Sequence, residues 1–91
     1  MKQEINIGDI VLSNAGRDAG KYLVVVAKED NFAFLCNGKL RGCGKPKKKK
    51  LKHIKPFGKV SDFALDKLLK GESLSDKELK AELRVFSENL A

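Results

Sequence analysis

The sequence predicts a domain that is mainly β and is followed by a short helical tail. In the first half of the chain, runs of β-branched and aromatic residues alternate with Gly, Asn and Asp, which is typical of short strands joined by tight turns. The last third has helix-capping residues and apolar residues at helical spacing. Charge changes at the same point, since residues 1–60 carry 14 Lys/Arg and 5 Asp/Glu (net +9) and residues 61–91 carry 5 and 7 (net −2). We therefore expect a basic β domain over residues 1–60 and an acidic amphipathic helical tail over residues 61–91.

Three strands are predicted over residues 9–13, 21–28 and 32–36. Each run is rich in Val, Ile, Leu or Phe and is bounded by Gly, Asn or Asp. Asp30 and Asn31 separate the second run from the third and fit a tight hairpin turn, because Asn tolerates a positive φ.

Weaker strand signals follow. A fourth strand is predicted over residues 49–54, at an edge of the sheet because only Leu51 and Ile54 in it are strongly apolar. A short strand over residues 57–60, after Pro56, is expected to complete the sheet. Short strands with Gly-rich turns predict a small, tightly curved barrel, since an open sheet of this size would leave a bare edge.

The tail is predicted to form two short helices. Ser61 is the expected cap of a helix over residues 62–70 that ends at Gly71, and its apolar positions are Phe63, Leu65, Leu68 and Leu69. Ser75 and Glu78 form a capping box, and the helix after it has an apolar stripe made of Leu79, Leu83, Phe86 and Leu90. We expect the tail to pack on its own chain through Phe63, Leu79, Leu83 and Phe86 and to leave the basic loops uncovered. A monomer is expected rather than a homodimer.

Residues 45–53 are the most informative stretch. They hold six lysines and one histidine within nine residues, namely Lys45, Lys47, Lys48, Lys49, Lys50, Lys52 and His53. Like charges so close together repel one another, and a polyanion removes that repulsion. Each phosphate that a lysine neutralises also releases condensed counterions, so the stretch predicts nucleic-acid binding.

Two further segments extend the basic surface. Gly16 and Gly20 permit a positive φ and close backbone approach in a loop that also holds Arg17 and Lys21, whose charges suit phosphate or an unpaired base. Residues 37–52 form a basic loop, in which Lys39 and Arg41 precede the lysine run, and we expect it to be a mobile arm that orders on RNA. The alternative for each segment is a solvated loop without a partner.

Neither catalysis nor metal binding is predicted. His53 is the only histidine, no catalytic partner is placed beside it by sequence, and no glycine-rich phosphate loop precedes a Lys-Ser/Thr pair. The spacing of Cys36, Cys43 and His53 does not match a zinc site, so we expect no cofactor, with Cys36 a core residue and Cys43 a loop thiol. The chain has neither a membrane-length apolar run nor a signal-like start, which predicts a cytoplasmic protein.

The aromatic residues indicate how a nucleic acid would be read. Phe32, Phe34 and Phe57 are candidate stacking platforms. Because Phe32 and Phe34 alternate with Ala33 and Leu35, however, one face of that strand must be core, and we expect the phenylalanines to be mostly buried. Tyr22, beside the glycine loop, is the better candidate for stacking on a base. The surface is therefore expected to recognise phosphates and shape more than base edges.

Part of the chain resembles a known family. Residues 7–26, with Gly8-Asp9 before the loop Ala15-Gly16-Arg17-Asp18-Ala19-Gly20-Lys21 and a valine-rich strand after it, are similar to a KOW motif. The wider stretch of residues 6–56 resembles the KOW-bearing large-subunit ribosomal proteins of archaea and eukaryotes, in which an acidic-Asn turn and a basic strand follow. Here Asp30-Asn31 and residues 47–54 occupy those places.

The resemblance implies an SH3-like barrel that binds RNA, with ribosomal RNA as the partner and association with the ribosome. Residues 61–91 have no counterpart in that family, which favours a small KOW-type RNA-binding protein over a structural ribosomal protein. One alternative function is a protein-interaction module that recruits an acidic partner in transcription or translation. A DNA-binding module is a weaker alternative, because the second helix is net acidic.

Overall fold

The computed structural model describes residues 4–14, 16, 19–37 and 46–90, which form five strands, a 3-10 turn and two helices in that part of the chain. The strands are β1 (Asp9–Ser13), β2 (Tyr22–Glu29), β3 (Phe32–Cys36), β4 (Lys47–Lys50) and β5 (Ile54–Lys59). The 3-10 turn η2 (Leu51–His53) joins β4 to β5, and the helices are α1 (Asp62–Leu69) and α2 (Asp76–Leu90). The class predicted from the sequence, mainly β with an α tail, is confirmed.

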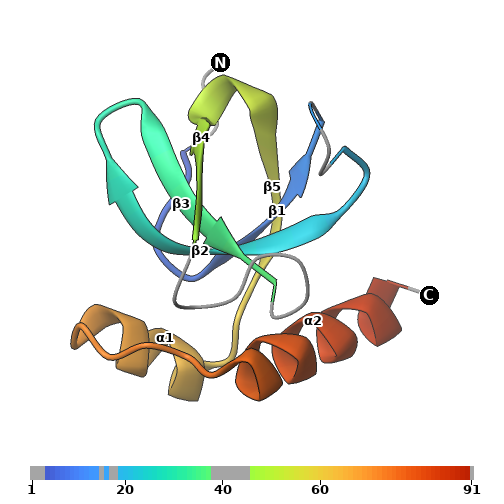
Figure 1. Cartoon of the computed structure of the whole chain (residues 1–91). Coiled ribbons are helices and arrows are strands. Elements are labelled where there is room, and N and C mark those ends of the chain that lie inside the picture. The colour runs from blue at the N-terminus through green and yellow to red at the C-terminus, as the bar shows by residue number, and fades with distance from the viewer. Residues whose placement is uncertain (1–3, 15, 17–18, 38–45, 91) are drawn as a thin grey trace.

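The five strands form one antiparallel sheet in the order β4-β3-β2-β1-β5. The first and third predicted strands have the predicted bounds, and the second is shifted by one residue. Within the described residues β4 pairs only with β3 and β5 only with β1, so the sheet is not closed by hydrogen bonds. It nevertheless curls strongly above the two helices (Figure 1).

The predicted fourth strand is wrong in its bounds. It begins at Lys47 and ends at Lys50, where the chain enters η2 instead of continuing to Ile54. The backbone of Leu51 donates to Asn31 O at 2.9 Å, and Asn14 N donates to His53 O at 3.0 Å. These bonds fix the turn between the two sheet edges, and β5 then begins earlier than the predicted strand of residues 57–60.

Two apolar clusters lie on opposite faces of the sheet, because side chains alternate along each strand. In β2, Leu23 and Val25 point into the curl of the sheet, whereas Val24 points to the helices, and all three are fully buried. The inner cluster consists of Ile5, Val11, Leu23, Val25, Ala33, Leu35 and Ile54. The outer cluster joins the sheet to the tail through Ile10, Val24, Cys36, Val60, Ala64, Leu68, Leu74 and Leu79. As expected, Cys36 is a core residue, whereas Cys43 lies outside the described residues.

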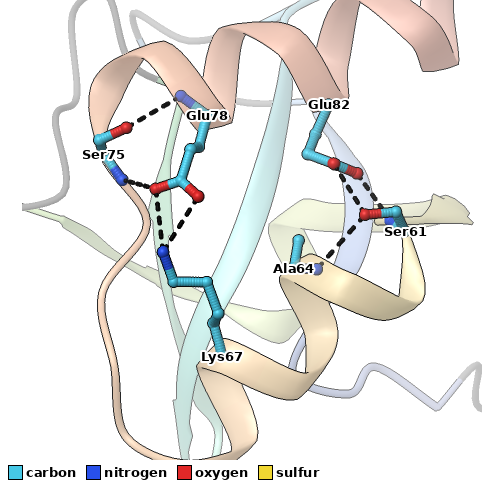
Figure 2. Close-up of polar contacts among 6 residues, drawn as sticks. All are labelled: Ser61, Ala64, Lys67, Ser75, Glu78 and Glu82. Atoms are coloured by element: carbon cyan, nitrogen blue, oxygen red, sulfur yellow. Dashed lines mark hydrogen bonds and ion pairs between the residues drawn. The ribbon is translucent and has the colours of Figure 1, made fainter.

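Both helices begin where their sequence predicts, α2 also ends there, and α1 ends at Leu69, one residue before the predicted end. The Ser61 hydroxyl accepts from Ala64 N at 3.3 Å and caps α1, and Gly71 follows that helix with a φ of 82°. In the capping box of α2, Glu78 N donates to the Ser75 hydroxyl at 3.1 Å and Ser75 N donates to the Glu78 carboxylate at 2.9 Å (Figure 2). Glu82 of α2 accepts from both the backbone and the hydroxyl of Ser61, which ties α2 to the N-terminus of α1.

The burial of the tail differs in part from the prediction. Leu79 is fully buried and Leu83 and Phe86 are half-buried against the outer cluster, as expected for packing on the same chain. Phe63 and Leu69, however, are 69% and 66% exposed. The reason is that α1 turns its Ala64–Leu68 side toward the sheet, so the smaller Ala64 occupies the contact that Phe63 was expected to make.

Helix α2 packs closely on the sheet at Gly58 of β5. A Cβ atom built on Gly58 would lie 2.5 Å from Cε1 of Phe86, so the ring lies directly on the backbone of β5. Tyr22 contacts this ring edge-on, with centroids 5.1 Å apart, and contacts Phe57 in the same way at 5.9 Å. Within the described residues, no helix is both long enough and apolar enough to cross a membrane.

Candidate nucleic-acid interface

The lysine run forms β4, and the pleat of the strand divides its side chains between two faces. Lys47 and Lys49 lie opposite Leu35 and Ala33, whose side chains are in the inner cluster, and both lysines are half-buried. Lys48 and Lys50 are exposed on the outer face. The four consecutive lysines are therefore two pairs with different surroundings.

Lys49 of the inner pair reaches toward the glycine loop. The Lys49 ammonium donates to the hydroxyl of Ser13, which is fully buried at the end of β1, at 2.6 Å. A Cβ atom on Gly16 would lie 3.7 Å from the same ammonium. The structure thus brings together two segments that the sequence marks independently, the lysine run and the loop between β1 and β2.

The outer pair lies beside two aromatic rings. Phe34 is directly opposite Lys48 and Phe32 is directly opposite Lys50 in the ladder between β3 and β4. The Lys48 ammonium stands 4.5 Å from the centre of the Phe32 ring and 5.8 Å from that of Phe34. It is also 4.0 Å from a carboxylate oxygen of Glu29.

The predicted burial of the phenylalanines holds for two of the three. Phe32 and Phe34 are mostly buried, with some exposure left, whereas Phe57 is 45% exposed and departs from the prediction. The exposure that remains in β3 follows from the alternation itself, since the core face is formed by the smaller pair Ala33 and Leu35 and the rings take the other face. This alternation is the sequence signal that places the rings on the face opposite Ala33 and Leu35.

The glycine loop has the backbone expected for it. Gly16 and Gly20 have φ values of 74° and 84°, in the region that favours glycine. Gly20 N donates to Ser13 O at 2.8 Å, and Lys21 after it is exposed. Arg17, the loop residue expected to bind phosphate, lies outside the described residues.

The remaining basic residues fall into two groups. Lys52 and His53 lie in η2, with Lys52 exposed and His53 half-buried. Lys39, Arg41 and Lys45 lie outside the described residues, as does half of the predicted arm. In that arm Lys47–Lys50 form a paired strand and residues 51 and 52 lie in η2, which corrects the predicted basic loop of residues 37–52.

The turn between β2 and β3 and the role of Tyr22 also differ from the prediction. The positive φ, 40°, belongs to Asp30 and not to Asn31. Tyr22 is not a free stacking platform, because it packs between Phe57 and Phe86. It lines a groove of about 780 Å³ with Lys21 from the sheet side and Lys80 and Arg84 from α2.

Several cations of the described surface were not expected from the sequence. Lys55 stands 5.7 Å from the centre of the Phe57 ring on β5, and Lys59 is exposed on the same strand. Lys80 and Arg84 were overlooked because α2 is net acidic as a whole, although these two cations share one side of the helix. Their i, i+4 spacing in the sequence is the signal that could have grouped them.

Over the described residues, no three His, Cys, Asp or Glu side chains converge as metal ligands would. Comparison of the sequence with protein-family models gives no match, and a search of curated proteins finds no significant relative. The residues themselves and their geometry are therefore the basis for assigning a function.

Proposed function

We propose that the protein binds structured RNA, with the lysines of β4 and the loop between β1 and β2 as one interface. The observation that carries the proposal is the position of Lys49, which links the lysine strand to the glycine loop through Ser13. A loop whose glycines have positive φ allows close backbone approach, and a strand of consecutive lysines supplies charge beside it.

The charge distribution supports a polyanionic partner. Residues 1–60 have a net charge of +9, and the carboxylate of Glu29, 4.0 Å from Lys48, offsets only a small part of the charge on β4. Exposed lysines on an edge strand discourage pairing with another sheet, but protection of the edge does not require a run of four lysines. Phosphates along an RNA backbone would offset the mutual repulsion of these lysines and release counterions.

The same proposal includes a finer fold and a class of RNA. We propose an SH3-like barrel of the KOW type, with ribosomal RNA as the substrate class that the resemblance of residues 6–56 suggests. The support is the order β4-β3-β2-β1-β5 and the three-residue turn η2, which connects the two edge strands of the sheet. A connection so short keeps the two edges near each other at that end.

Crosslinking to RNA in living cells tests the function. We expect the parent to crosslink to RNA under ultraviolet light, and the Lys48→Ala/Lys50→Ala variant to lose most of the signal. A matched control removes two exposed lysines from the tail, Lys70 and Lys77, and should crosslink like the parent. Sequencing the bound RNA then identifies the substrate.

Two outcomes would contradict the proposal. A parent that crosslinks to no RNA would exclude it. Recovery of an acidic protein that RNA does not displace would instead favour a protein-interaction module.

A further inference from the structure

The outer face of β3 and β4 has two partly exposed aromatic rings that belong to neither apolar cluster. Phe32 and Phe34 are two residues apart on one strand, so both point to the same side of the sheet. Neither ring is part of the inner cluster, and neither is among the half-buried residues that pack against the outer cluster. The outer cluster that joins the helices to the sheet at Val24 and Cys36 thus does not include these rings, which remain partly accessible.

Cations are aligned with the rings. Lys50 is directly opposite Phe32 and Lys48 directly opposite Phe34, so each ring has a lysine beside it on the same face. Two residues along a strand correspond to about 6.5 Å, a separation that successive phosphates of an extended nucleic-acid strand can match. The Lys48 ammonium lies over the Phe32 ring at 4.5 Å, which places a positive charge at the ring face itself.

We infer that this face, defined by Phe32, Phe34, Lys48 and Lys50, stacks the unpaired bases of single-stranded RNA. The inference rests on the proposed RNA binding and adds to it the kind of RNA segment that is bound. Aromatic rings beside a track of cations are the arrangement by which single strands are held, with bases on the rings and phosphates at the cations. In a duplex the base faces are stacked on one another, so they cannot stack on the phenylalanine rings.

Charge complementarity favours this occupant over an apolar protein surface. The lysines attract an anionic chain, and flat rings pair with flat bases. Glu29 weakens the binding of an anionic chain, because its carboxylate lies 4.0 Å from Lys48 and would repel a phosphate there. On binding, the Lys48 ammonium would move from the Phe32 ring to a phosphate and leave the ring face to a base.

The test compares a short oligouridylate strand with an RNA duplex of the same length. The Phe32→Leu/Phe34→Leu variant keeps apolar side chains on the strand but has no rings for stacking. Removal of one stacked base lowers affinity by about 5- to 150-fold. We therefore expect the single strand to bind at least about 5-fold more weakly to this variant, with an unchanged dependence on salt because every lysine is retained. Duplex affinity should stay at the parent value.

The chain offers a matched control and a gain-of-binding variant. Phe63 of α1 is exposed and has the Lys67 ammonium 5.6 Å from its ring centre, so it repeats the lysine–ring pair away from this face. Phe63→Leu should bind both RNAs like the parent. Glu29→Gln should bind the single strand more tightly than the parent does, because the repelling carboxylate is removed.

Four results would overturn the inference. If the folded Phe32→Leu/Phe34→Leu variant binds oligouridylate as tightly as the parent, the rings do not stack bases. If the variant loses duplex and single-strand binding equally, or if the parent binds an oligoglutamate peptide as tightly as RNA, the face does not select unpaired bases. A parent that binds neither RNA would reject the proposed function itself, and with it this inference.

Discussion

The Lys49 ammonium donates a hydrogen bond of 2.6 Å to the Ser13 hydroxyl, which joins edge strand β4 to the end of β1 although the two residues are 36 positions apart. Lys49 is therefore partly a structural residue. Its neighbours Lys48 and Lys50 are exposed on the other face of the strand. The lysine run thus combines a contact that stabilises the fold with charges that remain accessible to a partner.

Replacing Lys49 by Met should destabilise the fold although the apolar stem of the side chain is kept. Ser13 is fully buried, and removing one partner of a buried hydroxyl costs about 1 kcal/mol of unfolding free energy. Urea unfolding measures the difference, and Lys48→Met, which changes an exposed residue, is the matched control. Equal stability of the two variants would show that the bond to Ser13 contributes nothing.

Replacing Gly58 by Ala should disturb the packing of α2 on β5. The new Cβ would lie 2.5 Å from Cε1 of Phe86, so the ring must move, and overpacking of this kind costs about 1–3 kcal/mol. Combining it with Phe86→Leu removes the clash, and the double variant should be more stable than the sum of the two single effects predicts. Strict additivity in urea unfolding would exclude a direct contact between the two positions.

The Glu78 carboxylate should make stability depend on pH in the acid range. The backbone hydrogen bond from Ser75, followed by the bond from Lys67, lowers the pKa of Glu78 below its ordinary value of 4.5 (Figure 2). Because the folded-state pKa is the lower one, the stabilisation is present above pH 4.5 and is lost as pH falls through the folded-state pKa.

Glu78→Gln provides the comparison, since the amide oxygen can still accept from Ser75 but carries no charge. The parent should be more stable than this variant near neutral pH, and the difference in unfolding free energy should shrink as the solution is acidified. A difference that is the same at neutral pH and well below pH 4.5 would contradict the lowered pKa.

Leu79 should contribute strongly to the stability of the fold. This side chain is fully buried in the outer cluster, so Leu79→Ala is expected to cost about 2–5 kcal/mol of unfolding free energy, as measured by urea unfolding.

The protein should be a monomer, because the apolar stripe of α2 already packs within the chain. Sedimentation at micromolar concentration should therefore give the mass of one chain. A dimer that Leu83→Glu dissociates would show instead that the stripe pairs with a second copy.

Local signals in the sequence were sufficient for β1, β2, β3 and the two helices, but not for the bounds of β4 and β5. The capping residues Ser61 and Ser75, the stop at Gly71 and the β-branched runs act over a few residues, so their effect can be read from the chain. The turn η2 could not be anticipated in this way. It arises because β4 and β5 join opposite edges of the sheet, and that pairing depends on residues far apart in the sequence.

Burial was harder to anticipate than secondary structure. Phe63 is large and apolar, yet it is exposed, because α1 turns the smaller Ala64 toward the sheet; in β3 the core position likewise belongs to Ala33, and Phe32 lies on the other face. The basic segments could therefore be located from the sequence, but the placement of the Phe32 and Phe34 rings beside Lys48 and Lys50 could not. The hydrogen bond between Lys49 and Ser13 likewise could not be predicted, because it depends on the curvature of the sheet.

The dependence of RNA affinity on salt tests the central claim most directly, because it counts the phosphates that lysines neutralise. Lys48→Ala/Lys50→Ala should bind RNA more weakly than the parent and should reduce the slope of log affinity against log salt by about 0.7–0.9 for each phosphate that is no longer neutralised. Lys70→Ala/Lys77→Ala, with the same change in net charge, should retain the parent slope. Equal slopes for the parent and the β4 variant would contradict the claim that these lysines bind the RNA backbone.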